Sequence, residues 1–522
     1  MYIIKMAEKS FNINGYFNKI ISLSILLILA FFSAQKNIFC FESKFKYDFS
    51  QEKYNFNLPS KYDSRDKDIV TSVKKQFTRG SCWAFSVIST LETNYLSQTN
   101  SKKKINFSEK HLIDNMNLND KIISFDLKTS GNHEMASAYF SSGRGPVIKS
   151  YDNNDDIFKS ADKFIRNIIY LPDVKIFDEE NIKNHRELIK YFVHTYGAVA
   201  SNFYWDLNYL DKTQKNYFYN GAHETTNHSA SIIGWDDNYS RKNFKYCPDY
   251  DGAFILKNSW GDKILDSGFF YMSYQDYFAG YESCLFDNII DSSDKFYFKN
   301  IYQYDYFGML DSFDLNILKN NNFFCVKYGL KDNHIAASDI AFFIASPNTK
   351  IKIWFAKIDN NKIIEISDLI LEKKIKYPGF YCVELEKKFL IFDKNIYLVF
   401  KLNAEDLKIP CEGQIYDFSS KVDINENNYV FNNNDFILKK LKDFNISANL
   451  NIKLFVQKNL DNAQKINFKK INNNNNKNND KIDDYIDKDK NYNKNNINLS
   501  FLFSVLCIII LITFLIFLFI IF

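Results

Sequence analysis

The chain has 522 residues, too many for one hydrophobic core, so we expect two or three folded units with flanking segments. Its 66 Lys and Arg nearly balance 62 Asp and Glu, for a net charge of +4, and no basic block is interleaved with aromatic residues. A nucleic acid is therefore not expected as a partner. The 8 Cys and 7 His show no metal-ligand spacing, so we expect no metal and no cofactor.

The first segment, residues 1–40, is expected to be an export signal. Lys5, Lys9 and Lys19 precede an uncharged apolar run over residues 20–35, which is the order of charged and apolar regions in a secretory signal. No clean small-x-small triplet marks a cleavage point, so a cleaved signal peptide and an uncleaved signal anchor both stay open. Residues 41–57 leave room only for a short pro-segment.

The next region, residues 58–290, mixes helical and strand patterns and is predicted to be α+β. A helix expected to begin near Ser81 carries apolar residues on one face, at Phe85, Ile88, Leu91 and Tyr95. Cys82 would then lie at a helix N-terminus, where N–H groups and the helix dipole favour a thiolate. The alternative role for such a cysteine is that of a small buried hydrophobe.

Two further polar residues stand beside apolar, strand-like runs. His228 precedes the run 229–235, and Asn258 follows the run 253–257 and opens the motif Asn-Ser-Trp-Gly. An imidazole can exchange a proton with a thiol, and an amide can orient the imidazole. His223 is the competing histidine, and a satisfied core histidine is the alternative role for His228.

The order of these motifs, with Gln76 before Cys-Trp-Ala-Phe, resembles the papain family of cysteine peptidases. Supporting segments in the family's order are Leu58-Pro59, Phe107 to Leu112, Gly145-Pro146-Val147, Gly197-Ala198-Val199 and Gly268-Phe269-Phe270. The resemblance implies a two-lobed fold, with a helical lobe and a β-barrel-like lobe.

The resemblance also implies roles for four residues. Cys82 would be the attacking thiolate, His228 the general acid that protonates the leaving amine, and Asn258 the group that holds the imidazole. The side-chain N–H of Gln76 and the backbone N–H of Cys82 would receive the developing oxyanion. The expected catalytic set is therefore Cys82, His228, Asn258 and Gln76.

Other positions have supporting roles or depart from the family pattern. Trp260 would shield the His–Asn hydrogen bond, and Ser130 with Gly131 stands where the family has a Gly-Gly pair that binds the extended substrate. Arg79 stands where many members have a disulfide cysteine, and we predict no disulfide, although a pair such as Cys247 with Cys284 stays open. The short pro-segment resembles prokaryotic members, in which a lectin-like domain often follows.

A second region, residues 298–458, shows short alternating runs typical of strands, at 351–353, 395–403 and 452–456. Turn signals separate them at Pro347-Asn348, Asp359-Asn360-Asn361 and Pro378-Gly379. This pattern predicts an all-β antiparallel sandwich. Its short motifs resemble the lectin-like module, which implies a possible glycan or surface partner.

The last part of the chain is expected to anchor the protein. Residues 459–500 are rich in Asn, Lys and Asp and are predicted to be a disordered tether. The uncharged segment 501–522 would reach ~33 Å as a helix, enough to cross a bilayer. We therefore expect a single-pass cell-membrane protein with its catalytic domain outside the cell.

Together these expectations describe a surface cysteine endopeptidase that hydrolyses extended polypeptides through a Cys82–His228 thiolate–imidazolium pair. A surface adhesin with a vestigial peptidase domain is the alternative from another class. A transpeptidase would share the acylation steps and differ in the amine that resolves the acyl-enzyme.

Overall fold

The computed structural model describes the following residues: 46–47, 54, 56–76, 80–101, 104–115, 131–149, 161–174, 178–221, 225–291, 300–332, 334–413, 423–458 and 460–471. The predicted signal, the terminal segment 501–522, most of the tether, His223 and Ser130 lie outside these residues. Across the described part of the chain, no helix is both long enough and apolar enough to span a membrane.

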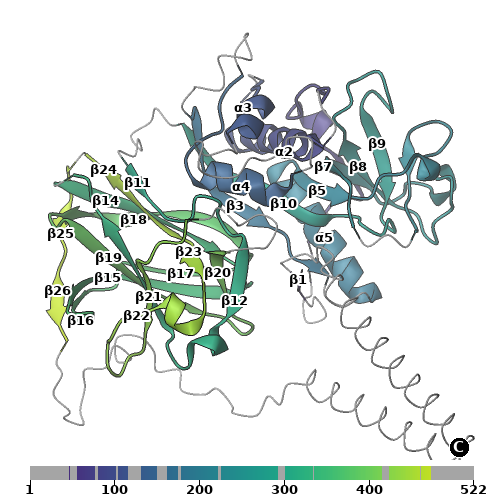
Figure 1. Cartoon of the computed structure of the whole chain (residues 1–522). Helices are drawn as coiled ribbons and strands as arrows, with labels where there is room; N and C mark the ends of the chain where they lie inside the picture. The colour runs from purple at the N-terminus through teal and green to yellow at the C-terminus, as the bar shows by residue number, and fades with distance from the viewer. Residues whose placement is uncertain are drawn as a thin grey trace, which may run out of the picture. The chain divides into compact units, whose positions relative to one another are not determined.

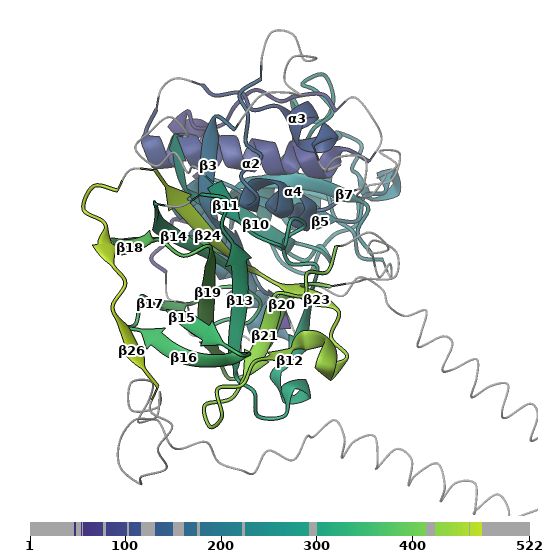
Figure 2. The ribbon, with the colours of Figure 1, turned by 60° about the vertical axis from the view of Figure 1, so that its left-hand side comes forward.

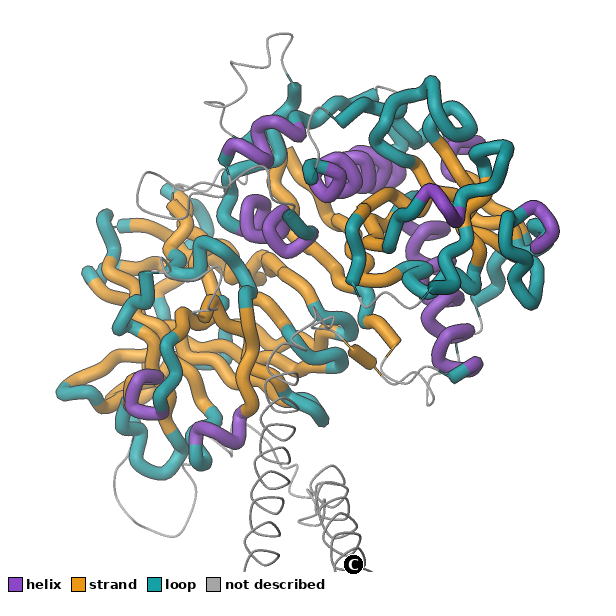
Figure 3. The backbone as a smooth tube through the Cα atoms, turned by 45° about the vertical axis from the view of Figure 1, so that its right-hand side comes forward, coloured by secondary structure: helices purple, strands orange, loops and turns teal. Residues whose placement is uncertain are grey.

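All α-helices of the described chain lie in the N-terminal region, residues 56–291. They are α2 (Cys82–Thr99), α3 (Glu109–Asp114), α4 (His133–Ser141) and α5 (Glu179–Tyr196). The helical segments that Figure 3 also draws in purple in the strand-rich region are short 3₁₀ turns. The strands up to residue 291 are β1 (Lys46–Tyr47), β2 (Lys61–Asp63), β3 (Lys163–Tyr170), β4 (Asp173–Val174), β5 (Val199–Phe203), β6 (Asn216–Tyr217), β7 (His228–Asp236), β8 (Ala253–Lys257), β9 (Phe269–Ser273) and β10 (Tyr281–Asp291). The predicted mixture of helices and strands is confirmed.

The predicted helix after Ser81 is α2, which begins at Cys82. The sequence suggested one apolar face, but α2 is buried on nearly all sides, because it packs against β7 and β10 as well as against α3 and α4. One of its buried polar side chains, Asn94, is fully paired within the fold: its amide donates to the carbonyls of Tyr196 and Ala198 and accepts from the N–H of Phe286. These bonds make burial of a polar side chain tolerable.

The C-terminal region, residues 300–471, is built from strands and short 3₁₀ turns (Figure 1). Its strands are β11 (Asn300–Tyr302), β12 (Asp311–Asp314), β13 (Phe323–Gly329), β14 (Ile335–Ile344), β15 (Thr349–Asp359), β16 (Lys362–Ser367), β17 (Leu371–Ile375), β18 (Gly379–Ile391), β19 (Asn395–Asn403), β20 (Lys408–Gly413), β21 (Asn428–Phe431), β22 (Lys439–Lys440), β23 (Ala448–Leu450), β24 (Ile452–Gln457), β25 (Gln464–Lys465) and β26 (Phe468–Lys470). One core cluster joins apolar side chains of β14, β18 and β24 to those of β13, β15 and β19. Two sheets therefore pack face to face, as a β-sandwich requires.

The two regions share one sheet, which the sequence analysis did not anticipate. A sheet of 13 strands in the described chain has the main order β11-β24-β14-β18-β3-β10-β5-β7-β8-β9-β6. It passes from the C-terminal to the N-terminal region where β18 pairs antiparallel with β3, from Gly379 opposite Ile169 to Tyr381 opposite Asn167 (Figure 2). Gly379 has φ 147°, and a Cβ there would lie 2.1 Å from the Ile168 carbonyl oxygen, so only glycine fits.

Side chains also join the regions in a common core. Phe343, Phe380 and Phe455 of the C-terminal region belong to the same buried cluster as the apolar residues of α2, α3 and α4. Beneath them, Arg166 of β3 forms an ion pair with Asp339 of β14 at 2.7 Å, and both side chains are almost fully buried. The regions therefore share strand pairing, core and buried charge, and are not independent units joined by a linker.

The β-structure continues past residue 459, where the sequence analysis began the tether. β25 pairs with β18 and β26 pairs with β16, and Ile466 and Phe468 pack on the sandwich core. The Asn- and Lys-rich composition led the sequence analysis to assign this stretch to the tether. Ile466 and Phe468 are nevertheless apolar and two positions apart, a spacing that suits one face of a strand. The last strand of the described chain, β26, ends at Lys470.

Candidate active site

Cys82 is the first residue of α2 and is buried. Its side chain is 7% exposed. Burial raises the pKa of the Cys82 thiol, whereas hydrogen bonds from the backbone N–H groups of Ser229, Trp83 and Cys82 itself act in the opposite direction. Backbone N–H groups at the start of α2 and in β7 therefore act to lower the pKa of the thiol, against the effect of burial.

His228 and Asn258 lie side by side at the ends of β7 and β8. His228 Nε2 is 2.9 Å from Asn258 Oδ1, and the backbone N–H of Ser259 donates to the same oxygen at 2.8 Å. Because a backbone N–H can bond only to an acceptor, this atom must be the amide oxygen. Nε2 of His228 therefore carries a proton, and in the neutral ring Nδ1 is the basic nitrogen.

Aromatic rings cover this pair. The Trp260 indole stacks on the His228 ring at a centroid distance of 4.8 Å and an angle of 23°, and Phe203 contacts its edge at 5.2 Å. Trp205 packs against Trp260 at 4.9 Å, and the Asn227 amide holds its backbone by two hydrogen bonds. The sequence analysis did not identify Trp205, because no motif marks this loop residue.

The burial of His228 also affects its pKa and so its charge state. Burial lowers the pKa of His228 to about 4, against the effect of the Asn258 hydrogen bond. Burial of both groups thus favours a neutral thiol and a neutral imidazole. A thiolate–imidazolium pair needs the mutual attraction of the two charges, and it stays a prediction.

Gln76 is tied to the loop that carries Asn258. Its backbone N–H donates to the Ser259 carbonyl at 2.7 Å, and its Oε1 accepts from the Ser259 hydroxyl at 2.7 Å. With Oε1 directed at Ser259, Nε2 is the atom of the amide that can donate elsewhere, as an oxyanion donor must. Sequence reasoning identified Gln76 but not Ser259, the residue that orients it.

Of the predicted substrate-binding residues Ser130 and Gly131, only Gly131 lies within the described residues. Gly131 lies against the indole of Trp83, and a Cβ at this position would be 2.4 Å from Trp83 Cε2. The close approach explains why glycine stands here. Trp83 follows Cys82 directly, so the backbone of Gly131 runs next to the start of α2.

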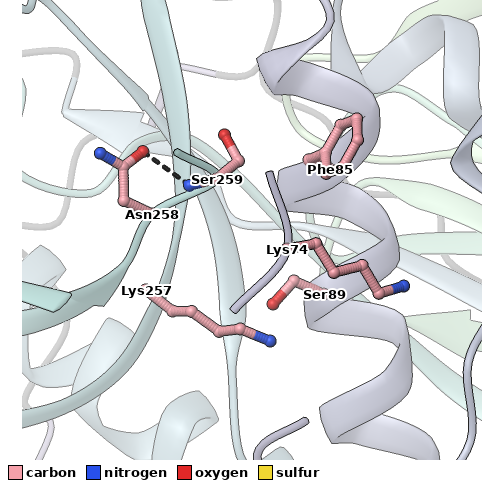
Figure 4. Close-up of a pocket in the computed structure, with 6 residues that line it drawn as sticks. All are labelled: Lys74, Phe85, Ser89, Lys257, Asn258 and Ser259. Atoms are coloured by element: carbon pink, nitrogen blue, oxygen red, sulfur yellow. Dashed lines mark hydrogen bonds between the residues drawn. The ribbon is translucent and has the colours of Figure 1, made fainter. Parts of the chain in front are cut away.

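A buried charge network lies under the site, and sequence reasoning did not find it. Lys74 Nζ donates to Glu92 at 2.7 Å and to Glu109 at 2.6 Å, and Lys257 Nζ donates to Thr71 at 3.0 Å. Figure 4 shows the small pocket above it, lined by Lys74, Phe85, Ser89, Lys257, Asn258 and Ser259. The network links β8 to α2 and α3 and holds Thr71 and Lys74, which lie just before Gln76 in the chain.

A cysteine at a helix start, a histidine on a strand and an asparagine whose amide oxygen binds the imidazole are the residues expected in a papain-like thiol hydrolase. The family model for "Papain family cysteine protease" matches residues 58–288, and the model for "Lectin like domain" matches residues 301–456. Residues 58–288 therefore belong to the papain family of cysteine proteases, and residues 301–456 form a lectin-like domain. Inside the described ranges, no group of three or more His, Cys, Asp or Glu could hold a metal ion.

Curated relatives match up to about two fifths of this chain in the examples that follow. Cathepsin F of Drosophila melanogaster is 48% identical over 61 residues, which are 12% of this chain and 10% of that protein. A probable cysteine protease of Arabidopsis thaliana is 26% identical over 232 residues, 41% of this chain and 58% of that protein. The viral cathepsin of Heliothis zea nuclear polyhedrosis virus is 29% identical over 225 residues, 41% and 52% of the two chains. The chain thus spans about half the length of the Arabidopsis and viral relatives, and a smaller share of the Drosophila protein.

Two solved structures share the arrangement of both domains. One contains the cysteine protease and lectin-like domains of Cwp84, a surface layer associated protein of Clostridium difficile, with a TM-score of 0.65, 20% identity and coverage of 83% of this chain and 96% of that chain. A variant of the clostridial cysteine protease Cwp84 after propeptide cleavage gives a TM-score of 0.66, 21% identity and coverage of 77% and 100%. At this identity the likeness establishes the shared fold. The predicted combination of a papain-like fold with an all-β lectin-like domain is confirmed.

Proposed function

We propose that this protein is a cysteine endopeptidase that hydrolyses peptide bonds of extended polypeptides at the cell surface. The observation that carries the proposal is the hydrogen bond at His228: Nε2–H is held by Asn258 Oδ1, which leaves Nδ1 as the basic nitrogen of the ring. Cys82, the first residue of α2, would supply the thiol that this nitrogen deprotonates. The family match over residues 58–288 supports the proposal.

The residues present can perform acyl transfer through a thioester. His228 Nδ1 takes the thiol proton, and the thiolate forms a C–S bond to the substrate carbonyl carbon while the oxygen gains negative charge. Gln76 Nε2 and the Cys82 N–H donate to this oxyanion. As the C=O bond re-forms, the C–N bond breaks and His228 gives its proton to the leaving amine. Water then attacks the thioester, its proton passing to His228, and the carboxylic acid and thiol are released.

The proposed surface location rests on the ends of the chain. The charged-then-apolar segment 1–40 suits export, and the uncharged segment 501–522 suits a membrane helix. The structurally similar Cwp84 is a surface layer associated protein, which supports a comparable location. Protease accessibility of the folded domains on intact cells, with and without removal of residues 501–522, tests this part of the proposal.

The lectin-like domain supports a second function, the binding of a glycan or a surface partner. The shared sheet makes an isolated fragment unsuitable for testing, because cutting before residue 300 would expose the edge of β18. A glycan array probed with full-length Cys82→Ala protein keeps both domains folded and excludes proteolysis. Binding of a glycan by the Cys82→Ala protein supports the second function. Absence of binding to any glycan on the array contradicts a glycan-binding role.

A thiol-directed epoxide tests the peptidase. The wild-type protein should be labelled once, at Cys82, and should cleave members of a peptide library, whereas Cys82→Ala should do neither. Cys247 is the matched control, because it is an exposed thiol far along the chain. Cys247→Ala should keep both labelling and cleavage.

Absence of labelling and of turnover in folded wild-type protein would overturn the peptidase proposal. Analysis of the products separates hydrolysis from transpeptidation: hydrolysis in H₂¹⁸O places ¹⁸O in the new carboxyl group, and transpeptidation joins the acyl fragment to an added amine.

A further inference from the structure

A row of aromatic rings leads away from His228, and the mechanism above does not use its outer part. The Trp205 ring lies 6.1 Å from the His228 ring, between centroids, and stacks on Tyr217 at 4.6 Å and 12°. Trp260, which stacks on His228, contacts the same Trp205 ring at 4.9 Å. The row therefore starts directly at the imidazole that protonates the leaving amine in the proposed mechanism.

The row continues from Tyr217 through further tyrosines to the surface. The Tyr217 hydroxyl donates to the Tyr204 carbonyl at 2.5 Å, and the Tyr204 ring contacts the ring of Tyr219 at 4.8 Å. Tyr219 is buried and contacts Tyr209 at 4.8 Å, and Tyr209 contacts Tyr246 at 5.4 Å. We refer to these tyrosines and the leucine of the same loop as the aromatic strip: Tyr204, Leu207, Tyr209, Tyr219 and Tyr246.

The outer edge of the aromatic strip is apolar, exposed and fixed in place. Leu207 is 70% exposed and Tyr246 is 41% exposed. Leu207 begins a 3₁₀ turn, in which the Asp206 carboxylate accepts from the Asn208 N–H at 2.8 Å. Lys245 Nζ donates to the Asn208 carbonyl at 2.7 Å and lies 5.4 Å from the centroid of the Tyr246 ring. An apolar side chain that is held in water next to exposed aromatic rings is typical of a binding surface.

The chemistry of the proposed mechanism indicates which part of a substrate meets the aromatic strip. His228 gives its proton to the leaving amine, so the leaving segment of the polypeptide lies on the side of the His228 ring. Leu207 is two residues beyond Trp205, at most about 7 Å farther along the chain. An extended substrate advances about 3.3 Å per residue, so its residues three to five after the scissile bond can reach the strip.

We propose that the aromatic strip binds the leaving side of the substrate and selects polypeptides with an apolar or aromatic side chain about three to five residues after the scissile bond. The proposal rests on the proposed function, because it assumes that Cys82 and His228 cleave the peptide bond. Asp206 and Lys245 border the strip with opposite charges, so apolar contact and not net charge decides which segment binds.

Peptides with one fixed acyl part and an otherwise polar leaving segment of six residues test the proposal in the full-length protein. Phe is placed in turn at the second to the sixth leaving position, and Ser at the same position is the reference. The measured quantity is the ratio of kcat/KM with Phe to kcat/KM with Ser, because kcat/KM reports the step in which the leaving segment is still attached. For wild-type protein we expect a ratio of about 10 at the third to fifth position.

Two variants of the aromatic strip should lower this ratio. Leu207→Ser and Tyr246→Ser each remove part of the apolar contact, so each should reduce the ratio by roughly 3-fold. Tyr250→Ser is the matched control, because Tyr250 is also 41% exposed and follows four residues after Tyr246, but its ring faces Arg186 of α5. It should keep the wild-type ratio. The ratio is unaffected by a loss of active enzyme, since one protein sample hydrolyses both peptides.

A wild-type ratio near one at every position, in protein that cleaves these peptides through Cys82, would overturn this inference and leave the proposed function standing. The same follows if Leu207→Ser and Tyr246→Ser keep the wild-type ratio, or if Tyr250→Ser lowers it equally. Wild-type protein that neither cleaves a peptide library nor is labelled at Cys82 would instead refute the proposed function. Leu207 has an aliphatic side chain that makes no hydrogen bond, so Leu207→Ser keeps the test decisive if Tyr246→Ser does not fold.

Discussion

Replacing Arg166 by Met should strongly destabilise the protein. Arg166 and Asp339 are 2.7 Å apart, with side chains 5% and 0% exposed, and they join β3 to β14. The substitution leaves a carboxylate in the core without its paired guanidinium, which typically costs about 3–5 kcal/mol. The Lys408–Asp314 pair, also at 2.7 Å but 49% and 55% exposed, is the matched control. Lys408→Met should cost less than about 1 kcal/mol.

Urea unfolding followed by tryptophan fluorescence measures both free energies. The double variant Arg166→Met/Asp339→Leu removes both charges and should recover most of the loss, because neither desolvated ion is left without its partner. Burial raises the pKa of Asp339, against the effect of Arg166. Without Arg166 the pKa rises further, so the folded state takes up a proton that the unfolded state does not bind, and the deficit shrinks as the pH falls.

Two outcomes would refute this reasoning. The first is a loss in Arg166→Met no larger than that in Lys408→Met. The second is a double variant that is as unstable as the sum of the single variants. Either would mean that the pair is hydrated or replaceable, and that the shared sheet does not depend on it.

Two further predictions concern the site and the response to acid. Gln76→Ala should lower kcat by roughly 100- to 1000-fold, because it removes an oxyanion donor, while alkylation of Cys82 changes little; an equal loss in both would place Gln76 outside the oxyanion site. Burial lowers the pKa of His185 to about 4 from 6.5, so the unfolded chain binds this proton first and the folded state loses stability as the pH falls below 6.5. Relative to wild type, His185→Leu should therefore gain about 2 kcal/mol between pH 7 and pH 5 in urea unfolding, and an unchanged difference would contradict the burial effect.

Local features of the sequence were enough to predict the elements that carry the site. Apolar spacing placed the start of a helix at Ser81 and Cys82, and α2 begins there. The alternating run 395–403 is β19, with the same bounds. The motif order also brought His228 and Asn258 together as candidates, and they are 2.9 Å apart. Such predictions succeed because periodicity and short motifs depend on residues that are close in the chain.

Contacts between distant segments were decided only in the tertiary structure. The pairing of β18 with β3 joins residues about 210 positions apart, and no local pattern distinguishes an edge strand that meets another domain from one that meets water. Likewise His133 showed no ligand spacing in the sequence, yet its ring lies between Glu282 and Ser229.

The charge state of the site depends on the same long-range packing. Helix position alone suggested a thiolate at Cys82, and the backbone donors at the start of α2 agree with it. Burial acts the other way on both Cys82 and His228, and it comes from rings and strands far away in the chain. The sequence by itself therefore determined the candidate residues Cys82, His228, Asn258 and Gln76. The tertiary structure decided how these residues are held and which neighbours act on their pKa values, because desolvation and hydrogen bonding depend on neighbours that only folding brings together.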